Sequence, residues 1–146
     1  MRMLPDRIDS VEVLEDLLSE PTESAIEAAR GSTGDLVVLG AGGKMGPTLA
    51  RMARRAADAA GVERAIFAVS RFGSAETRQR LDEAGVRTIA CDLLDDAAVL
   101  ELPDATDVIY MAGMKFGASM FFTEYSMKPA ELACDIAVEM VEERGK

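Results

Sequence analysis

The sequence predicts a three-layer α/β fold, in which helices cover both faces of a parallel sheet of about four strands. Two observations lead to this prediction. From Asp35 onward, short apolar runs alternate with longer stretches of helical periodicity, a pattern typical of βαβ units. A glycine-rich turn also stands directly between the first apolar run and a long amphipathic helix. Right-handed crossovers between successive strands then give the strand order 3-2-1-4.

The individual elements follow from apolar periodicity and from residues that begin or end helices. Four short strands, rich in residues suited to burial on both faces, are predicted at residues 36–39, 65–69, 86–91 and 108–111. Helices are expected near residues 44–60, 75–84, 95–101 and 129–143. Two further helices, at residues 10–18 and 22–30, precede the first strand and end at a flexible joint, residues 31–34. We interpret residues 1–34 as an N-terminal helical extension and residues 35–146 as a Rossmann-type unit, in a single domain overall.

Composition and charge exclude several classes of function. The 146 residues are 49% hydrophobic, enough for one covered core. A net charge of -10 disfavours nucleic acids and anionic membranes as partners. No apolar run approaches the ~20 residues that cross a bilayer, and the N-terminus lacks the pattern of a signal peptide, so we expect a cytoplasmic protein. The chain has no histidine, and Cys91 and Cys134 form no ligand cluster, which excludes metal catalysis and serine-histidine chemistry.

The glycine-rich turn runs from Gly40 to Gly46 and has the spacing GxxGxxG, with Gly43 as its middle glycine. Glycines at this spacing allow a tight turn, close approach of the backbone to a pyrophosphate and close packing of helix on strand. The first N–H groups of the following helix would bind the phosphates. A Walker loop would need a hydroxyl residue after Lys44, where this chain has Met45, so an ATPase is disfavoured. The alternative is a turn that only connects strand to helix, and Gly42, outside the spacing, would only ease the turn.

The end of the second predicted strand bears on the choice of nucleotide. NAD-binding sites usually place an acidic residue there, whereas this chain has Ser70 followed by Arg71. An arginine at this position accommodates a ribose 2′-phosphate, which favours NADP over NAD. The alternative is that Arg71 is a solvated loop cation, and Lys44 is likewise either a phosphate-attracting group or a surface side chain.

Residues after the third and fourth predicted strands complete the candidate site. Asp92 could accept a hydrogen bond from an adenine amino group, although an N-cap for the next helix is an alternative role that it could share with Asp95. Ala112 and Gly113 are small enough for close approach of a ribose or nicotinamide ring, although an ordinary glycine at the end of a strand is the alternative.

These motifs together resemble the cofactor-binding half of the extended short-chain dehydrogenases/reductases, the NAD-dependent epimerase/dehydratase family. The likeness covers about residues 35–113, and the N-terminal helices fall outside the family plan. It implies that the turn, including Lys44 and Met45, holds pyrophosphate and that Ser70 or Arg71 selects between NAD and NADP. It also implies that Asp92 and Leu93 meet adenine and that residues 112–113 line the cofactor.

The family's catalytic Tyr-x-x-x-Lys pair follows a fifth strand, and this chain ends before such a strand. Its only approximation is Tyr125-Ser126-Met127-Lys128, which is one residue too short. Tyr125 and Lys128 are therefore weak catalytic candidates. The sequence predicts an NAD(P)-binding domain that is not catalytically complete by itself, the cofactor half of an oxidoreductase or epimerase. One alternative is a non-enzymatic NAD(P)-sensing or interaction module. Another is a small enzyme whose site is assembled across an oligomer, although the missing Tyr-x-x-x-Lys pair argues against it.

Apolar residues near the C-terminus predict self-association. Five aromatic residues and methionines lie within residues 116–125, and the helix expected at residues 129–143 carries an apolar stripe. Exposed, these groups would favour a homo-oligomer, such as a dimer formed through either segment. The alternatives are that they fold into the local core or cover the sheet.

Overall fold

The computed structural model describes residues 5–112 and contains an α/β unit with an all-parallel sheet of four strands. The strand order is β3-β2-β1-β4, as predicted, which is a Rossmann-like layout. The strands are β1 (Leu36–Leu39), β2 (Ile66–Ser70), β3 (Arg87–Ala90) and β4 (Asp107–Tyr110). The bounds of β1 agree with the prediction, whereas β2 and β4 are each displaced by one residue and β3 is shorter at both ends.

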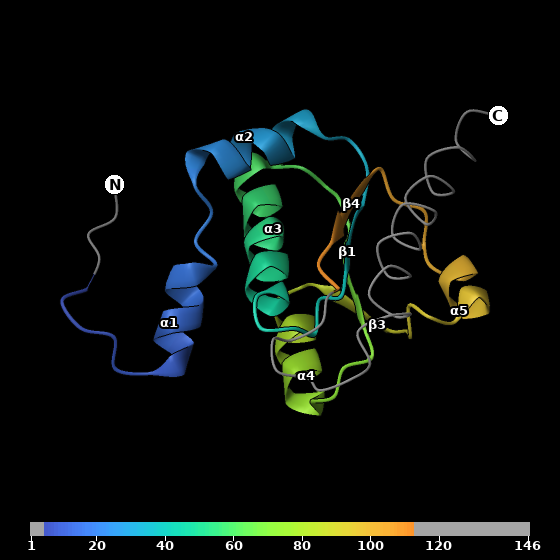
Figure 1. Cartoon of the computed structure of the whole chain (residues 1–146). Helices are drawn as coiled ribbons and strands as arrows, with labels where there is room; N and C mark the ends of the chain where they lie inside the picture. Colours follow the sequence, from blue (N-terminus) through green and yellow to red (C-terminus); the bar gives the residue numbers. More distant parts are fainter. Residues whose placement is uncertain (1–4, 113–146) are drawn as a thin grey trace, which may run out of the picture.

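The described helices are α1 (Val11–Leu18), α2 (Glu23–Gly31), α3 (Gly46–Ala60), α4 (Ala75–Glu83) and α5 (Asp96–Leu100). Figure 1 shows α3 and α4 on one side of the sheet and α5 on the other. In the same view α2 crosses the end of α3, and α1 lies beside α3. The helix expected at residues 129–143, the apolar segment 116–125 and the dimer contacts assigned to them lie outside the described residues. None of the described helices has the length and apolar character needed to span a membrane.

Four of these helices begin at a side chain that accepts a backbone N–H of the first turn. Ser10, Thr22, Ser74 and Asp95 cap α1, α2, α4 and α5 in this way. The helix after the glycine turn differs, because Met45 at its N-cap position makes no side-chain cap bond. The start of α3 therefore presents its first amides without a side-chain acceptor.

Two apolar clusters, one on each face of the sheet, hold the layers together. On one face, Val38 and Ala68 belong to the cluster that includes Ala50 of α3 and Leu81 of α4. On the other face, Val37 and Leu39 belong to a second cluster, against which residues of α5 pack. Alternate residues of β1 thus serve opposite layers, and all four are buried, as expected for the central strand of a doubly covered sheet.

The prediction that every strand is buried on both faces was wrong for the outer strands. Both end residues of β3 are exposed and its two middle residues are half-buried, and all four residues of β4 are half-buried. In the described part of the chain these strands lie at the two edges of the sheet and have one paired neighbour each. Edge strands receive less cover from the helices than β1 and β2 do.

A partly buried ion pair fixes the amino edge of the sheet to the end of α2. The side chain of Arg64, only 5% exposed, donates to Asp107 at the start of β4 (2.7 Å). The hydroxyl of Ser32, which follows α2, donates to the same carboxylate. These bonds, led by the one from Ser32, hold the pKa of Asp107 below its usual value. The N-terminal helices are thereby joined to both β2 and β4.

Candidate functional site

The candidate site lies at the carboxyl edge of the sheet, where the loops after all four strands meet. The amides of Gly40 and Ala41 donate to the carbonyl of Val69 at the end of β2 (2.8 and 3.0 Å). The amide of Met111, after β4, donates to the carbonyl of Leu39 (2.8 Å). The sheet grows in opposite directions from β1, because β2 pairs with it on one side and β4 pairs with it on the other. The turn therefore stands at a topological switch point, where open α/β sheets bind ligands.

Two glycines of the turn are required by the protein's own packing. Gly40 has a positive φ of 80°, and a Cβ there would lie 2.6 Å from the Cα of Ala112. A Cβ on Gly46 would lie 2.6 Å from the backbone of Ala41. Gly40 thus permits the turn and its contact with the end of β4, while Gly46 permits close packing of α3 against the turn.

The other two glycines of the turn differ from each other. Among the described residues, a Cβ on Gly43 would meet no atom closer than the carbonyl oxygen of Gly40, at 3.6 Å, so their packing does not require a glycine there. A Cβ on Gly42 would lie 3.0 Å from the Cβ of Ser70, and closer still to its hydroxyl. The prediction that Gly42 only eases the turn was therefore wrong, because Gly42 makes room for the last residue of β2.

A cavity of about 410 Å³ opens beside the turn, within the usual size range of small-ligand sites. It is lined by residues from all four loops, namely Gly40, Gly42, Gly43, Ser70, Arg71, Phe72, Gly73, Cys91, Asp92, Leu93, Leu94, Tyr110, Met111 and Ala112. Of the predicted residues outside this lining, Lys44 and Met45 are exposed on the turn and Gly46 is buried against Ala41. Gly113, Tyr125 and Lys128 lie outside the described residues. The fold thus brings most of the predicted cofactor-binding positions to one cavity.

The charged residues of this lining are one cation and one anion, Arg71 and Asp92. Within residues 5–112, neither Arg71 nor Lys44 has an ion-pair partner, whereas the arginines of α3 are paired with carboxylates. Two cations that flank the turn are therefore available to an anion from outside. The described residues contain no group of acidic, cysteine or histidine side chains that could hold a metal.

The sequence left open whether Asp92 or Asp95 caps the next helix, and the structure assigns the cap to Asp95. Asp95 is the N-cap of α5 and accepts from the amide of Ala98 (3.2 Å). Asp92 instead accepts from the amide of Leu94, two residues on (3.1 Å), and stays exposed at the cavity. This short turn fixes the direction of the Asp92 carboxylate while leaving its second oxygen without a bond among the described residues.

Seven lining residues were not predicted as site residues, and three of them, Phe72, Cys91 and Tyr110, have properties of their own. Phe72 has a φ of 46°, unusual for a side chain other than glycine, and its amide donates weakly to the Ser70 hydroxyl (3.4 Å). Burial raises the pKa of the Cys91 thiol and of the Tyr110 hydroxyl, which keeps both neutral near pH 7. Cys91 and Tyr110 stand at or near the last residue of a predicted strand, and Phe72 follows one closely, so nearness to the carboxyl end of a predicted strand was the signal that could have indicated all three.

No known family model matches the chain, and no curated protein matches it. The resemblance to the epimerase/dehydratase family therefore rests on the short motifs alone, and it stays a prediction.

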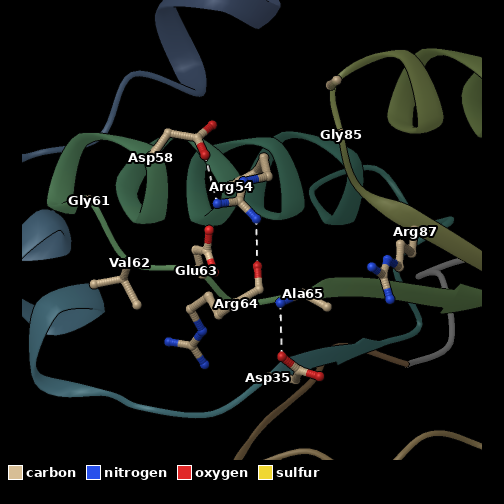
Figure 2. A pocket seen from close by; sticks show the side chains of 11 residues that line it. Asp35, Arg54, Asp58, Gly61, Val62, Glu63, Arg64, Ala65, Gly85 and Arg87 are labelled. Carbon is tan, nitrogen blue, oxygen red and sulfur yellow. Dashed lines mark hydrogen bonds and ion pairs between the residues drawn. The ribbon is translucent and has the colours of Figure 1, made fainter.

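A second, larger cavity of about 870 Å³ lies at the opposite, amino edge of the sheet (Figure 2). Its charged groups largely bond to one another or to backbone. Arg54 donates to Asp58 (2.6 Å) and to the carbonyl of Arg64 (2.5 Å), while Asp35 accepts from the amide of Ala65 (2.8 Å). The cavity also adjoins the C-terminal ends of α3 and α4, where the helix dipole repels anions. Despite its size, this cavity is the poorer candidate for a phosphate ligand.

Proposed function

We propose that the chain binds a dinucleotide, NADP in preference to NAD, in the cavity beside the glycine turn. The observation that carries the proposal is the position of Gly43. It faces this cavity at the switch point, beside a helix start whose N-cap side chain makes no cap bond, and no contact among residues 5–112 requires a glycine there. A ligand that must approach the backbone closely explains that glycine, and a pyrophosphate is the ligand that helix N-termini and such turns favour.

The cavity supports the adenosine half of the cofactor in particular. A pyrophosphate at the start of α3 would place the adenosine over the ends of β2 and β3. Arg71 would pair with the 2′-phosphate, which NAD lacks, while the free oxygen of Asp92 would accept from the adenine amino group and Leu93 would supply apolar contact. The other half would extend along Ala112 toward residues that follow the described ones.

The cofactor would supply hydride transfer, and the described residues would bind and orient it. Among them Tyr110 reaches the cavity with a phenol, but its raised pKa makes it a poor base near neutral pH. We therefore propose a cofactor-binding unit similar to that of an oxidoreductase or epimerase, in which the acid/base group comes from outside residues 5–112.

Titration with NADPH, NADH and ATP, followed by calorimetry and thermal denaturation, tests the proposal. At a concentration 100 times Kd, a ligand that binds only the folded state stabilises it by about 2.7 kcal/mol, which raises the Tm by about 8 °C. We expect this shift with NADPH, a smaller one with NADH and none with ATP at the same concentration. No shift with either dinucleotide would refute the proposal.

Arg71→Ala tests the preference for the 2′-phosphate. Loss of one partly solvated, charge-assisted bond should weaken NADPH binding about tenfold and leave NADH nearly unchanged. Arg30→Ala, at the exposed end of α2 and remote from the lining residues, is the matched control because it changes the net charge equally. Equal losses for the two nucleotides would remove the basis for preferring NADP.

A further inference from the structure

The first helix is attached to the protein by its charged side and turns apolar side chains outward. None of the residues of α1 is buried. Val11 is 59% exposed and Leu18 is 53% exposed, and Val13 and Leu14 are exposed as well. An amphipathic helix on a globular protein normally packs its apolar stripe against the core. The contacts that hold α1 must therefore be found on its polar side.

Two acidic residues of α1 lie against arginines of α3 and α4. Glu15 is placed between Arg51 (3.4 Å) and Arg80 (3.3 Å). Asp16 pairs with Arg51 at 2.5 Å. One carboxylate thus bridges two helices of the main unit, and the next residue strengthens the contact with α3.

Arg55 of α3 binds the C-terminal end of α1. Its Nη1 donates to the carbonyl of Asp16 (2.9 Å) and to the hydroxyl of Ser19 (2.9 Å), and its Nη2 pairs with Glu20. The last turn of α1 contains no basic residue of its own. Arg55 therefore supplies the cation that the negative end of a helix favours. Ser19 is completely buried at this contact.

We propose that Arg51, Arg55 and Arg80, the arginine face, form a docking surface for an acidic helix, and that α1 is its releasable occupant. Partly exposed ion pairs contribute little each and weaken as salt screens them. Leu17 is half-buried, but the other four apolar residues of α1 are exposed, so its attachment depends mainly on charge. An acidic helix of another protein, with carboxylates spaced as they are at residues 15, 16 and 20, would fit the same surface once α1 has left.

Hydrogen exchange of the α1 amides in the full chain tests the release. Raising NaCl from 0.05 to 1 M should accelerate exchange in α1 by about tenfold, because four ion pairs are screened. Glu15→Lys combined with Glu20→Lys should give fast exchange at both salt concentrations. The amides of α2, which packs on α3, should be unaffected and so report that the variant is folded.

Charge exchange separates ion pairing from any other effect of the substitution. Arg51→Glu and Arg80→Glu should also release α1, and adding Glu15→Arg to that variant should restore slow exchange. Exchange in α1 that responds neither to salt nor to charge reversal would overturn the proposal, as would a failure of the combined variant to recover.

A labelled peptide of residues 5–22 tests the docking surface in trans. Fluorescence anisotropy at low salt should show binding to the Glu15→Lys, Glu20→Lys chain and at least tenfold weaker binding to the unmodified chain, whose arginine face is covered. A peptide with glutamine at positions 15 and 20 and asparagine at position 16 serves as the control. Equal binding of the two peptides, or no binding to the released chain, would overturn the assignment of the surface.

Discussion

Replacement of Gly46 by alanine tests the geometry of the glycine turn without any ligand. The added Cβ would lie 2.6 Å from both the Cα and the carbonyl carbon of Ala41, and backbone atoms of a buried residue have no room to move. Crowding of this kind costs about 1–3 kcal/mol. For a chain of this length that corresponds to a fall in Tm of about 3–10 °C.

Gly43→Ala is the matched control, because within residues 5–112 its Cβ would meet nothing closer than 3.6 Å and the backbone φ is not positive. Here alanine should leave the stability unchanged or raise it by about 0.4–1 kcal/mol, through a less flexible unfolded chain. Thermal and urea denaturation followed by circular dichroism measure both variants. If Gly46→Ala is as stable as the unmodified chain, the packing of α3 against the turn is not as described. In the presence of NADPH, Gly43→Ala should become the less stable of the two variants, since its Cβ intrudes where the pyrophosphate is proposed.

Three further predictions concern other parts of the fold. Asp107→Asn should lower the free energy of unfolding by about 1–2 kcal/mol at pH 7, since it weakens the partner of the buried Arg64. Because the pKa of Asp107 is lowered in the folded state, urea melts should show this loss of stability above pH 3.8. The loss should disappear as the pH falls through the folded-state pKa. With the other cysteine replaced by serine, Cys91 should react with a disulfide reagent at pH 8 far more slowly than in urea, because burial raises its pKa, and equal rates would contradict its burial. Gly42→Ala should destabilise the fold, and Ser70→Gly should relieve much of that loss; additive free energies in a double-mutant cycle would rule out their contact.

The sequence predicts the order and type of the elements well because those depend on local periodicity. The four residues of β1 form one apolar run, and the helices begin at residues such as Ser74 and Asp95 whose side chains cap them. Burial of β3 was not predictable in the same way. Its residues, such as Ile89, suit a covered strand, and although the predicted strand order placed it at an edge, composition alone does not show how little the helices cover it there.

In the candidate site, too, features set by local spacing were predictable, whereas contacts between residues distant in the sequence were not. The spacing of glycines and the strand order place Gly40, Arg71 and Asp92 at one edge, and both were predictable. The contact between Gly42 and Ser70 joins residues from two loops, and its closeness depends on coordinates that no spacing rule supplies. The outward orientation of α1 was missed for a similar reason, since its arginine partners lie 35–65 residues away in the sequence.

Because α1 is short, its helical conformation depends on its attachment to the arginine face. Helices of eight residues are rarely stable alone in water, where about 12–15 residues are needed even for favourable sequences. Once Arg55 no longer neutralises its carboxyl end, the segment should lose its helical hydrogen bonds and become unfolded chain. Susceptibility to proteases at residues 11–18 should then rise at the same moment that the arginine face becomes accessible, so that cleavage of this arm would make the exposure permanent.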